Sequence, residues 1–159
     1  MTKELSIENI KTELIDNISN NAEILEYFTN YLRAKEKENY LKEYGTKYIR
    51  DNYFFPYDMS TSAYGNFIAV EVNEEEGTGF DGAKTYVKMY YRVNIIVALE
   101  DGKALDKISV LLGKIATELY PDRFSYKNTV YDIEYSYARA IQFTIGRHTP
   151  KINKCMDIS

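Results

Sequence analysis

One segment, residues 84–99, alternates between apolar and polar side chains more clearly than any other part of the chain. Every second residue from Val87 to Leu99 is apolar or aromatic, and Lys88, Tyr90 and Arg92 lie between them. This period of two predicts a β-strand with one face toward a core. At about 3.3 Å per residue, a continuous strand of this length spans roughly 50 Å. Because a small domain is narrower than that, we expect part of the strand to project as an arm or a hairpin.

Two other regions show the same alternation. Residues 67–73 predict a second strand. Residues 129–147 contain no Gly or Pro before Gly146, so they predict either one long strand or two strands joined by a tight turn near Ser136. Between the first two strands, residues 74–83 are acidic and rich in glycine, and we expect a flexible hairpin loop there.

The N-terminal region predicts helices instead, because its apolar residues recur at spacings of three and four. A first helix is predicted over residues 6–19, with Ser6 as its N-cap. Asn20 followed by Glu23 resembles a capping box, which predicts the start of a second helix.

Alternating charges over residues 33–43 predict a solvated helical stretch that continues to about Asn52, with Gly45 as a point of interruption. A later helix is predicted over residues 103–120, since its apolar residues form one stripe and Pro121 stops it.

The expected order of elements is α-α-β-β-α-β-β, which is an α+β fold. We expect N-terminal helices followed by an antiparallel or mixed sheet with one covering helix. With 159 residues, one domain is expected over residues 1–147, comprising a helical part (1–53) and a sheet-plus-helix part (66–147). Residues 148–159 are expected to form a basic tail that is mobile or ordered by a partner.

Composition excludes several classes of protein. The single cysteine, Cys155, cannot form an internal disulfide, and no apolar run approaches the roughly 20 residues of a membrane helix. The N-terminus lacks the apolar core of a signal peptide. A net charge of −4 makes the chain a poor candidate for wrapping nucleic acid. The C-terminal end is nevertheless basic, which suits contact with an acidic protein neighbour.

Residues 77–82 match the pattern G-x-G-x-x-G. In dinucleotide-binding folds this pattern follows a strand and opens a helix, whereas here a strand is expected to follow. Three glutamates at residues 74–76 would also repel phosphate. We therefore interpret the segment as an acidic hairpin loop that can become ordered against a partner.

No catalytic, metal or cofactor site is predicted. His148 is the only histidine, and it lies in the polar tail with Cys155, away from any third ligand. The outer face of residues 84–99 combines tyrosines with basic residues, a pattern that stacks nucleic-acid bases or forms a protein interface. The acidic net charge favours the protein interface over nucleic acid.

The order of the sequence segments carries a family resemblance. The segment FIAVEV (residues 67–72) leads into a loop, and YRVNIIVAL (91–99), a helix near Leu105 and IQFTI (141–145) follow. This order resembles the tail-terminator (tail-completion or neck) proteins of tailed bacteriophages. The resemblance implies a structural virion protein, assembled in the bacterial cytoplasm, that forms a hexameric ring between tail tube and head connector. It implies no enzyme activity and no cofactor.

The resemblance implies as partners further copies of the chain and the tail-tube and head-connector proteins, with DNA only as cargo in the lumen and no membrane. The interface candidates lie in the glycine-rich segment, on the long strand and in the tail: Glu74, Glu75, Glu76, Gly77, Gly79, Gly82, Tyr86, Tyr90, Arg92, Arg147, Lys151 and Lys154. Two alternatives stay open. One is another virion connector or baseplate component, and the other is a small intracellular inhibitor or regulator that binds a protein.

Overall fold

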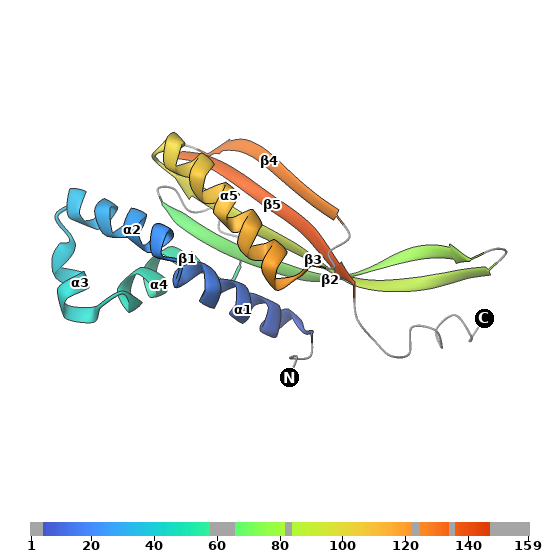
Figure 1. Cartoon of the computed structure of the whole chain (residues 1–159). Helices are drawn as coiled ribbons and strands as arrows, with labels where there is room; N and C mark the ends of the chain where they lie inside the picture. The colour runs from blue at the N-terminus through green and yellow to red at the C-terminus, as the bar shows by residue number, and fades with distance from the viewer. Residues whose placement is uncertain (1–4, 58–65, 82–83, 122–124, 134–135, 147–159) are drawn as a thin grey trace.

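The chain has an α+β fold in which helices precede a mixed sheet and one further helix lies between its strands (Figure 1). The predicted fold class is therefore confirmed. The structure, a computed structural model, describes residues 5–57, 66–81, 84–121, 125–133 and 136–146. The elements follow in the order α1 (Ile7–Ser19), α2 (Ala22–Ala34), α3 (Glu38–Tyr44), α4 (Lys47–Tyr53), β1 (Phe54–Phe55), β2 (Phe67–Asp81), β3 (Lys84–Leu99), α5 (Gly102–Leu119), β4 (Ser125–Ile133) and β5 (Ser136–Gly146).

The strands lie in the order β1-β2-β3-β5-β4. The two-residue strand β1 is parallel to β2, and every other pair is antiparallel. β2 and β3 pair along their whole length, from Phe67 opposite Ala98 to Asp81 opposite Lys84. β5 continues the sheet on the other side of β3, but only as far as Tyr90.

Two strand predictions are resolved by this register. The predicted loop over residues 74–83 is wrong for residues 74–81, which continue β2 as one strand. Glycine does not prevent extended backbone, and the strand formers of β3 offer a hydrogen-bonding partner opposite each of these residues. Of the two alternatives for residues 129–147, the hairpin is observed, because Ile133 of β4 pairs with Ser136 of β5.

Helix caps explain where the first helices begin. Ser6 caps α1 as predicted, and its hydroxyl accepts a hydrogen bond from a backbone N–H in the first turn. The predicted start of α2 at Asn20 is wrong by one residue. Asn20 is the C-cap of α1, and the Asn21 side chain accepts from the backbone N–H groups of Glu23 (3.0 Å) and Ile24 (3.2 Å). Asn20 and Asn21 are equally suitable as N-cap residues, so the sequence alone does not show which of them caps α2.

The charged stretch predicted after α2 is helical but is broken twice. Glu36, at φ 58°, separates α2 from α3, and Gly45, at φ 71°, separates α3 from α4. A left-handed residue ends a helix because the backbone can no longer continue the ladder of hydrogen bonds. The interruption expected at Gly45 is therefore confirmed, and it turns α4 back toward α1.

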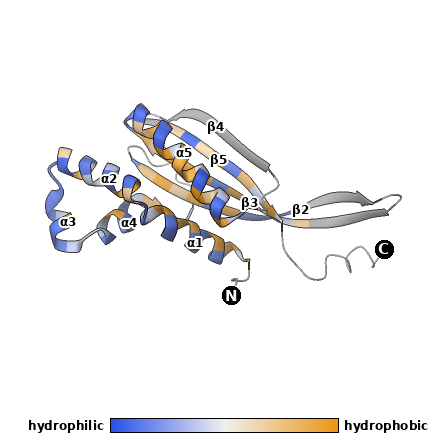
Figure 2. Ribbon diagram, viewed as in Figure 1, coloured by the Kyte–Doolittle hydropathy of each residue, from blue (hydrophilic) through white to orange (hydrophobic). Residues whose placement is uncertain are grey.

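The main core lies between one face of the sheet and the helices α1 and α5 (Figure 2). Apolar side chains from both helices pack against alternate residues of β2, β3 and β5. A smaller cluster of buried residues lies on the other face of the sheet, where alanines predominate: Phe67, Ala69, Ile96, Ala98, Ala138 and Ala140. Within the described residues, no helix is long and apolar enough to pass through a lipid bilayer.

Helix α5 is predicted to depend on its N-cap. Asp101 accepts hydrogen bonds from the backbone N–H groups of Lys103 (3.0 Å) and Ala104 (3.3 Å). We expect Asp101→Ala to lower the free energy of unfolding by about 1 kcal/mol, because two N–H groups lose their acceptor. Urea unfolding measures this change, and Asp101→Asn is the matched control because it keeps the cap. Equal losses in both variants would contradict the role of the cap.

Candidate protein interface

β2 and β3 continue together beyond the rest of the sheet as a two-stranded arm (residues 76–81 and 84–89) (Figure 1). β5 pairs with β3 only between Tyr90 and Leu99, so the arm has no third strand among the described residues. Six residues on each side give the arm a length of about 20 Å. The sequence prediction that part of the long strand projects from the body is thus confirmed.

Among the described residues, no strand pairs with either outer edge of the arm. A two-stranded ribbon on its own is marginally stable in water, and unpaired strand edges are ready to pair with another chain. Natural proteins usually cover such edges or keep them short. A long projecting ribbon is therefore a feature that favours contact with a partner.

Three of the predicted candidates meet where the arm leaves the body. The carboxylate of Glu75 accepts a hydrogen bond from the hydroxyl of Tyr90 (3.0 Å) and forms an ion pair with the guanidinium of Arg92 (3.0 Å). Tyr90 is directly opposite Glu75 in the register, and Arg92 is its diagonal neighbour. Such cross-strand pairs on one face fix the register of a hairpin and orient its strands.

Glu74 and Glu76 lie on the opposite face of the same strand, and both are exposed. Glu74 is opposite Tyr91, whose hydroxyl donates to the backbone carbonyl of Leu5 (3.2 Å). Glu76 is opposite the half-buried Met89. The three consecutive glutamates are thus divided between two faces, because successive side chains of a strand point in opposite directions.

The other candidates are distributed as follows. Gly77 and Gly79 lie in the arm within β2, and Gly79 is opposite Tyr86 of β3. The G-x-G-x-x-G pattern therefore begins inside a strand and does not open a helix, which removes the geometry that dinucleotide binding needs. The remaining candidates, like the tail itself, lie outside the described residues: Gly82, Arg147, Lys151 and Lys154.

Sequence reasoning missed an aromatic surface on the helical end of the molecule, which we call the tyrosine patch (Tyr40, Tyr44 and Tyr48). The rings of Tyr40 and Tyr48 stack with centroids 4.9 Å apart and nearly parallel planes, and Tyr44 stacks on Tyr48 at 6.3 Å. Tyr40 is 43% exposed and Tyr44 is 57% exposed. They are among the few large apolar side chains that the described residues expose, and such clusters mark interaction sites.

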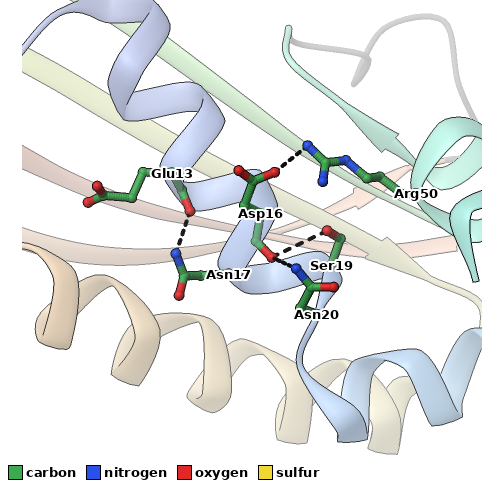
Figure 3. A network of polar contacts seen from close by, with 6 residues as sticks. All are labelled: Glu13, Asp16, Asn17, Ser19, Asn20 and Arg50. Atoms are coloured by element: carbon green, nitrogen blue, oxygen red, sulfur yellow. Dashed lines mark hydrogen bonds and ion pairs between the residues drawn. The ribbon is translucent and has the colours of Figure 1, made fainter. Parts of the chain in front are cut away.

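The tyrosine patch is anchored to the core. Tyr48 contacts Tyr53 edge to face, and Tyr53 stacks on the buried Phe28 at 5.3 Å between centroids. Burial, reinforced by the neighbouring tyrosines, raises the pKa of Tyr53 to about 12. Figure 3 shows a second link, in which Arg50 of α4 forms an ion pair with Asp16 of α1. These contacts fix the tyrosine patch to the helices α1 and α2.

The spacing of the patch residues was visible in the sequence. Positions 40, 44 and 48 are four residues apart, which predicts one face of a continuous helix. The break at Gly45 changes this arrangement, since Tyr40 and Tyr44 come from α3 and Tyr48 comes from α4. The contact between Tyr40 and Tyr48 depends on the turn between the two helices, which propensity alone does not define.

The described surface also contains a groove of about 540 Å³ between α1, α4 and β1. Its polar lining mixes both signs of charge, from Glu8 and Lys11 on α1 to Arg50 and Asp51 on α4. Arg50 is already engaged by Asp16. Within the described part of the chain, no three His, Cys, Asp or Glu side chains are grouped so that they could hold a metal ion.

No protein-family model, curated protein or solved structure matches this chain. A functional proposal therefore depends on the surfaces described above. The arm and the tyrosine patch lie at opposite ends of the molecule (Figure 1). Two different contact surfaces at opposite ends of a molecule are the arrangement that head-to-tail association needs, and such association generates rings or filaments.

Proposed function

We propose that this protein is a structural subunit of a bacteriophage neck, a tail terminator that forms a ring, caps the tail tube and joins it to the head connector. The observation that carries the proposal is the projecting β2–β3 arm at the end of the molecule opposite the tyrosine patch. A closed ring of identical subunits needs two different contact surfaces on each subunit. The arm and the patch supply two such surfaces.

The order of elements gives further support. β2, β3, α5 and β5 follow one another in the order on which the family resemblance was based, although residues 74–81 continue β2 where a loop was expected. The proposed role is structural and requires no catalysed reaction. The resemblance to tail terminators makes this role our choice over another connector, a baseplate component or an intracellular inhibitor.

Immunogold electron microscopy tests the proposal. Antibody against this protein is applied to phage particles released from the bacterial host after prophage induction. We expect label at the head–tail junction, with several copies at each junction. Label elsewhere on the particle would keep a virion role but overturn the terminator. An absence of label would overturn the structural role and favour an intracellular partner, which pull-downs from the host would then identify. Particles from a strain that lacks the coding sequence are the control for antibody specificity.

A further inference from the structure

We propose that the first residues after β5, residues 147–152, continue this strand along the open edge of β3, so that the arm gains a third strand. The inference concerns the arm within a single copy, so it stands or falls independently of the proposed function. It is drawn from the place where β5 ends, from the register of β5 against β3 and from the chain that follows.

β5 ends at the point where the arm leaves the body (Figure 1). It pairs with β3 one residue to one, from Tyr137 opposite Leu99 to Gly146 opposite Tyr90. Beyond Tyr90, the same edge of β3 has no partner among the described residues over residues 84–89. The last pair of this ladder therefore lies directly beside the first open position of the arm.

The chain after β5 is long enough to fill the open edge. Residues 147–159 follow Gly146 in the sequence, and the first six of them bring the strand to Lys84, where β3 begins. No turn or linker is needed, because the strand only has to keep its direction. The pairs that follow from the observed register are Arg147 with Met89, His148 with Lys88, Thr149 with Val87, Pro150 with Tyr86, Lys151 with Thr85 and Ile152 with Lys84.

The backbone of the arm gives a reason for this pairing. A two-stranded ribbon is marginally stable in water, and three or more strands are needed for independent stability. A strand from a separate molecule would lose translational and rotational freedom when it binds. A segment that begins beside the edge avoids most of this cost, since its effective concentration there is high. The occupant that fits the open edge of β3 best is therefore the chain's own continuation.

The segment also has the composition of an outermost strand. Natural sheets protect their edges with Lys and Pro, which discourage a further strand from pairing, and the missing N–H of proline is tolerated there. Pro150 and Lys151 lie within the segment, whereas residues 76–81 of β2 contain neither residue type. With the edge of β3 filled, the outer edge of β2 is the side of the arm at which a partner strand would add.

A pair of engineered cysteines tests the register. Cys155, the only cysteine, is replaced by serine, and Val87→Cys is combined with Thr149→Cys in the same chain. Residues opposite each other in an antiparallel pair have Cα atoms about 4.5–5.5 Å apart, which a disulfide can bridge. Under mild oxidation we expect a disulfide within one chain, detected by mass spectrometry and as a monomer on a non-reducing gel.

The matched control combines Val87→Cys with His148→Cys. Residue 148 is a neighbour of residue 149 in the sequence, but in a strand its side chain lies on the opposite face. The proposed strand should form the disulfide between positions 87 and 149 at least about tenfold faster than the one between positions 87 and 148. Similar rates would overturn the inference. A disulfide mainly between two chains would also overturn it, because the segment of a second copy would then fill the edge.

Hydrogen exchange tests the same pairing without cysteines. The wild type is compared with a chain that ends at Gly146 and with a control chain that ends at Ile152. We expect the amides of residues 84–89 that point away from β2 to exchange at least about tenfold faster in the first chain only, because their partner strand is missing. Residues 91–99, which β5 already pairs, are the internal reference. Unchanged exchange in the first chain, or equal acceleration in both, would overturn the inference.

Discussion

Replacing Phe28 with alanine is expected to lower the free energy of unfolding by about 3–5 kcal/mol, the cost of removing a fully buried aromatic ring. Phe28 has no exposed surface. Its ring lies 5.3 Å from that of Tyr53 in α4 and 5.5 Å from that of Phe54 in β1, between centroids. The side chain thereby joins α2 to α4 and to the edge of the sheet. Its loss leaves a cavity that these elements cannot easily close.

Chemical denaturation measures the effect, with circular dichroism as the signal. Val110→Ala is the control, because Val110 lies on α5 and is 57% exposed. The control should change the free energy of unfolding by no more than about 0.5 kcal/mol. A loss in Phe28→Ala as small as that of Val110→Ala would show that α2 does not contribute to the folding unit. Removing the Phe28 ring would also weaken the contacts that hold the tyrosine patch, because Phe28 stacks on Tyr53 and Tyr53 contacts Tyr48.

The sequence predicted the elements that have strong local signals. β3 occupies the predicted residues 84–99, because a period of two over sixteen residues is compatible only with a strand. α1 begins after Ser6, and α5 lies within one residue of its predicted bounds, since each combines an apolar stripe with a cap or a stop. In these elements, local preference and tertiary packing favour the same conformation.

The error over residues 74–81 has the opposite cause. Acidic residues and glycines have low strand propensity, so the local signal indicated a loop. The conformation is determined by the partner strand, because β3 pairs with every one of these residues. Pairing between strands is a tertiary interaction, and intrinsic propensity describes it poorly.

The candidate interface was predicted in part. Glu75, Tyr90 and Arg92 were all named from the sequence, but their contact depends on the register of β2 against β3. A shift of one residue would have placed Glu75 on the other face. The spacing of Tyr40, Tyr44 and Tyr48 is visible in the sequence, but the stacking of Tyr40 on Tyr48 could not be predicted, because it depends on the turn at Gly45 and on contacts between separate helices.

Shortening the arm is expected to abolish association and leave the fold intact. The change removes residues 76–89 and joins Glu75 to Tyr90 through an Asn-Gly turn, which suits a two-residue hairpin. Glu75 and Tyr90 are already opposite each other, so the register of the remaining sheet is kept. None of the buried residues described in the two clusters lies in the deleted segment, so we expect the core to be kept.

Removing residues from one strand alone would be a poor test. Deletion of residues 75–81 would leave residues 84–90 without their partners and would remove Glu75 from Tyr90 and Arg92. The symmetric deletion avoids this effect, so a change in association can be assigned to the arm itself. Thermal unfolding should give a melting temperature within a few degrees of the wild type.

Two outcomes would contradict the role given to the arm. A shortened protein that does not fold would show that the arm stabilises the body, although no third strand or helix among the described residues covers it. A shortened protein that folds and still associates like the wild type would show that the contact lies elsewhere. The same variant can be tested in phage assembly by examining particles from a host that supplies only the shortened protein. We expect heads and tails that fail to join, because the proposed terminator would act at that junction.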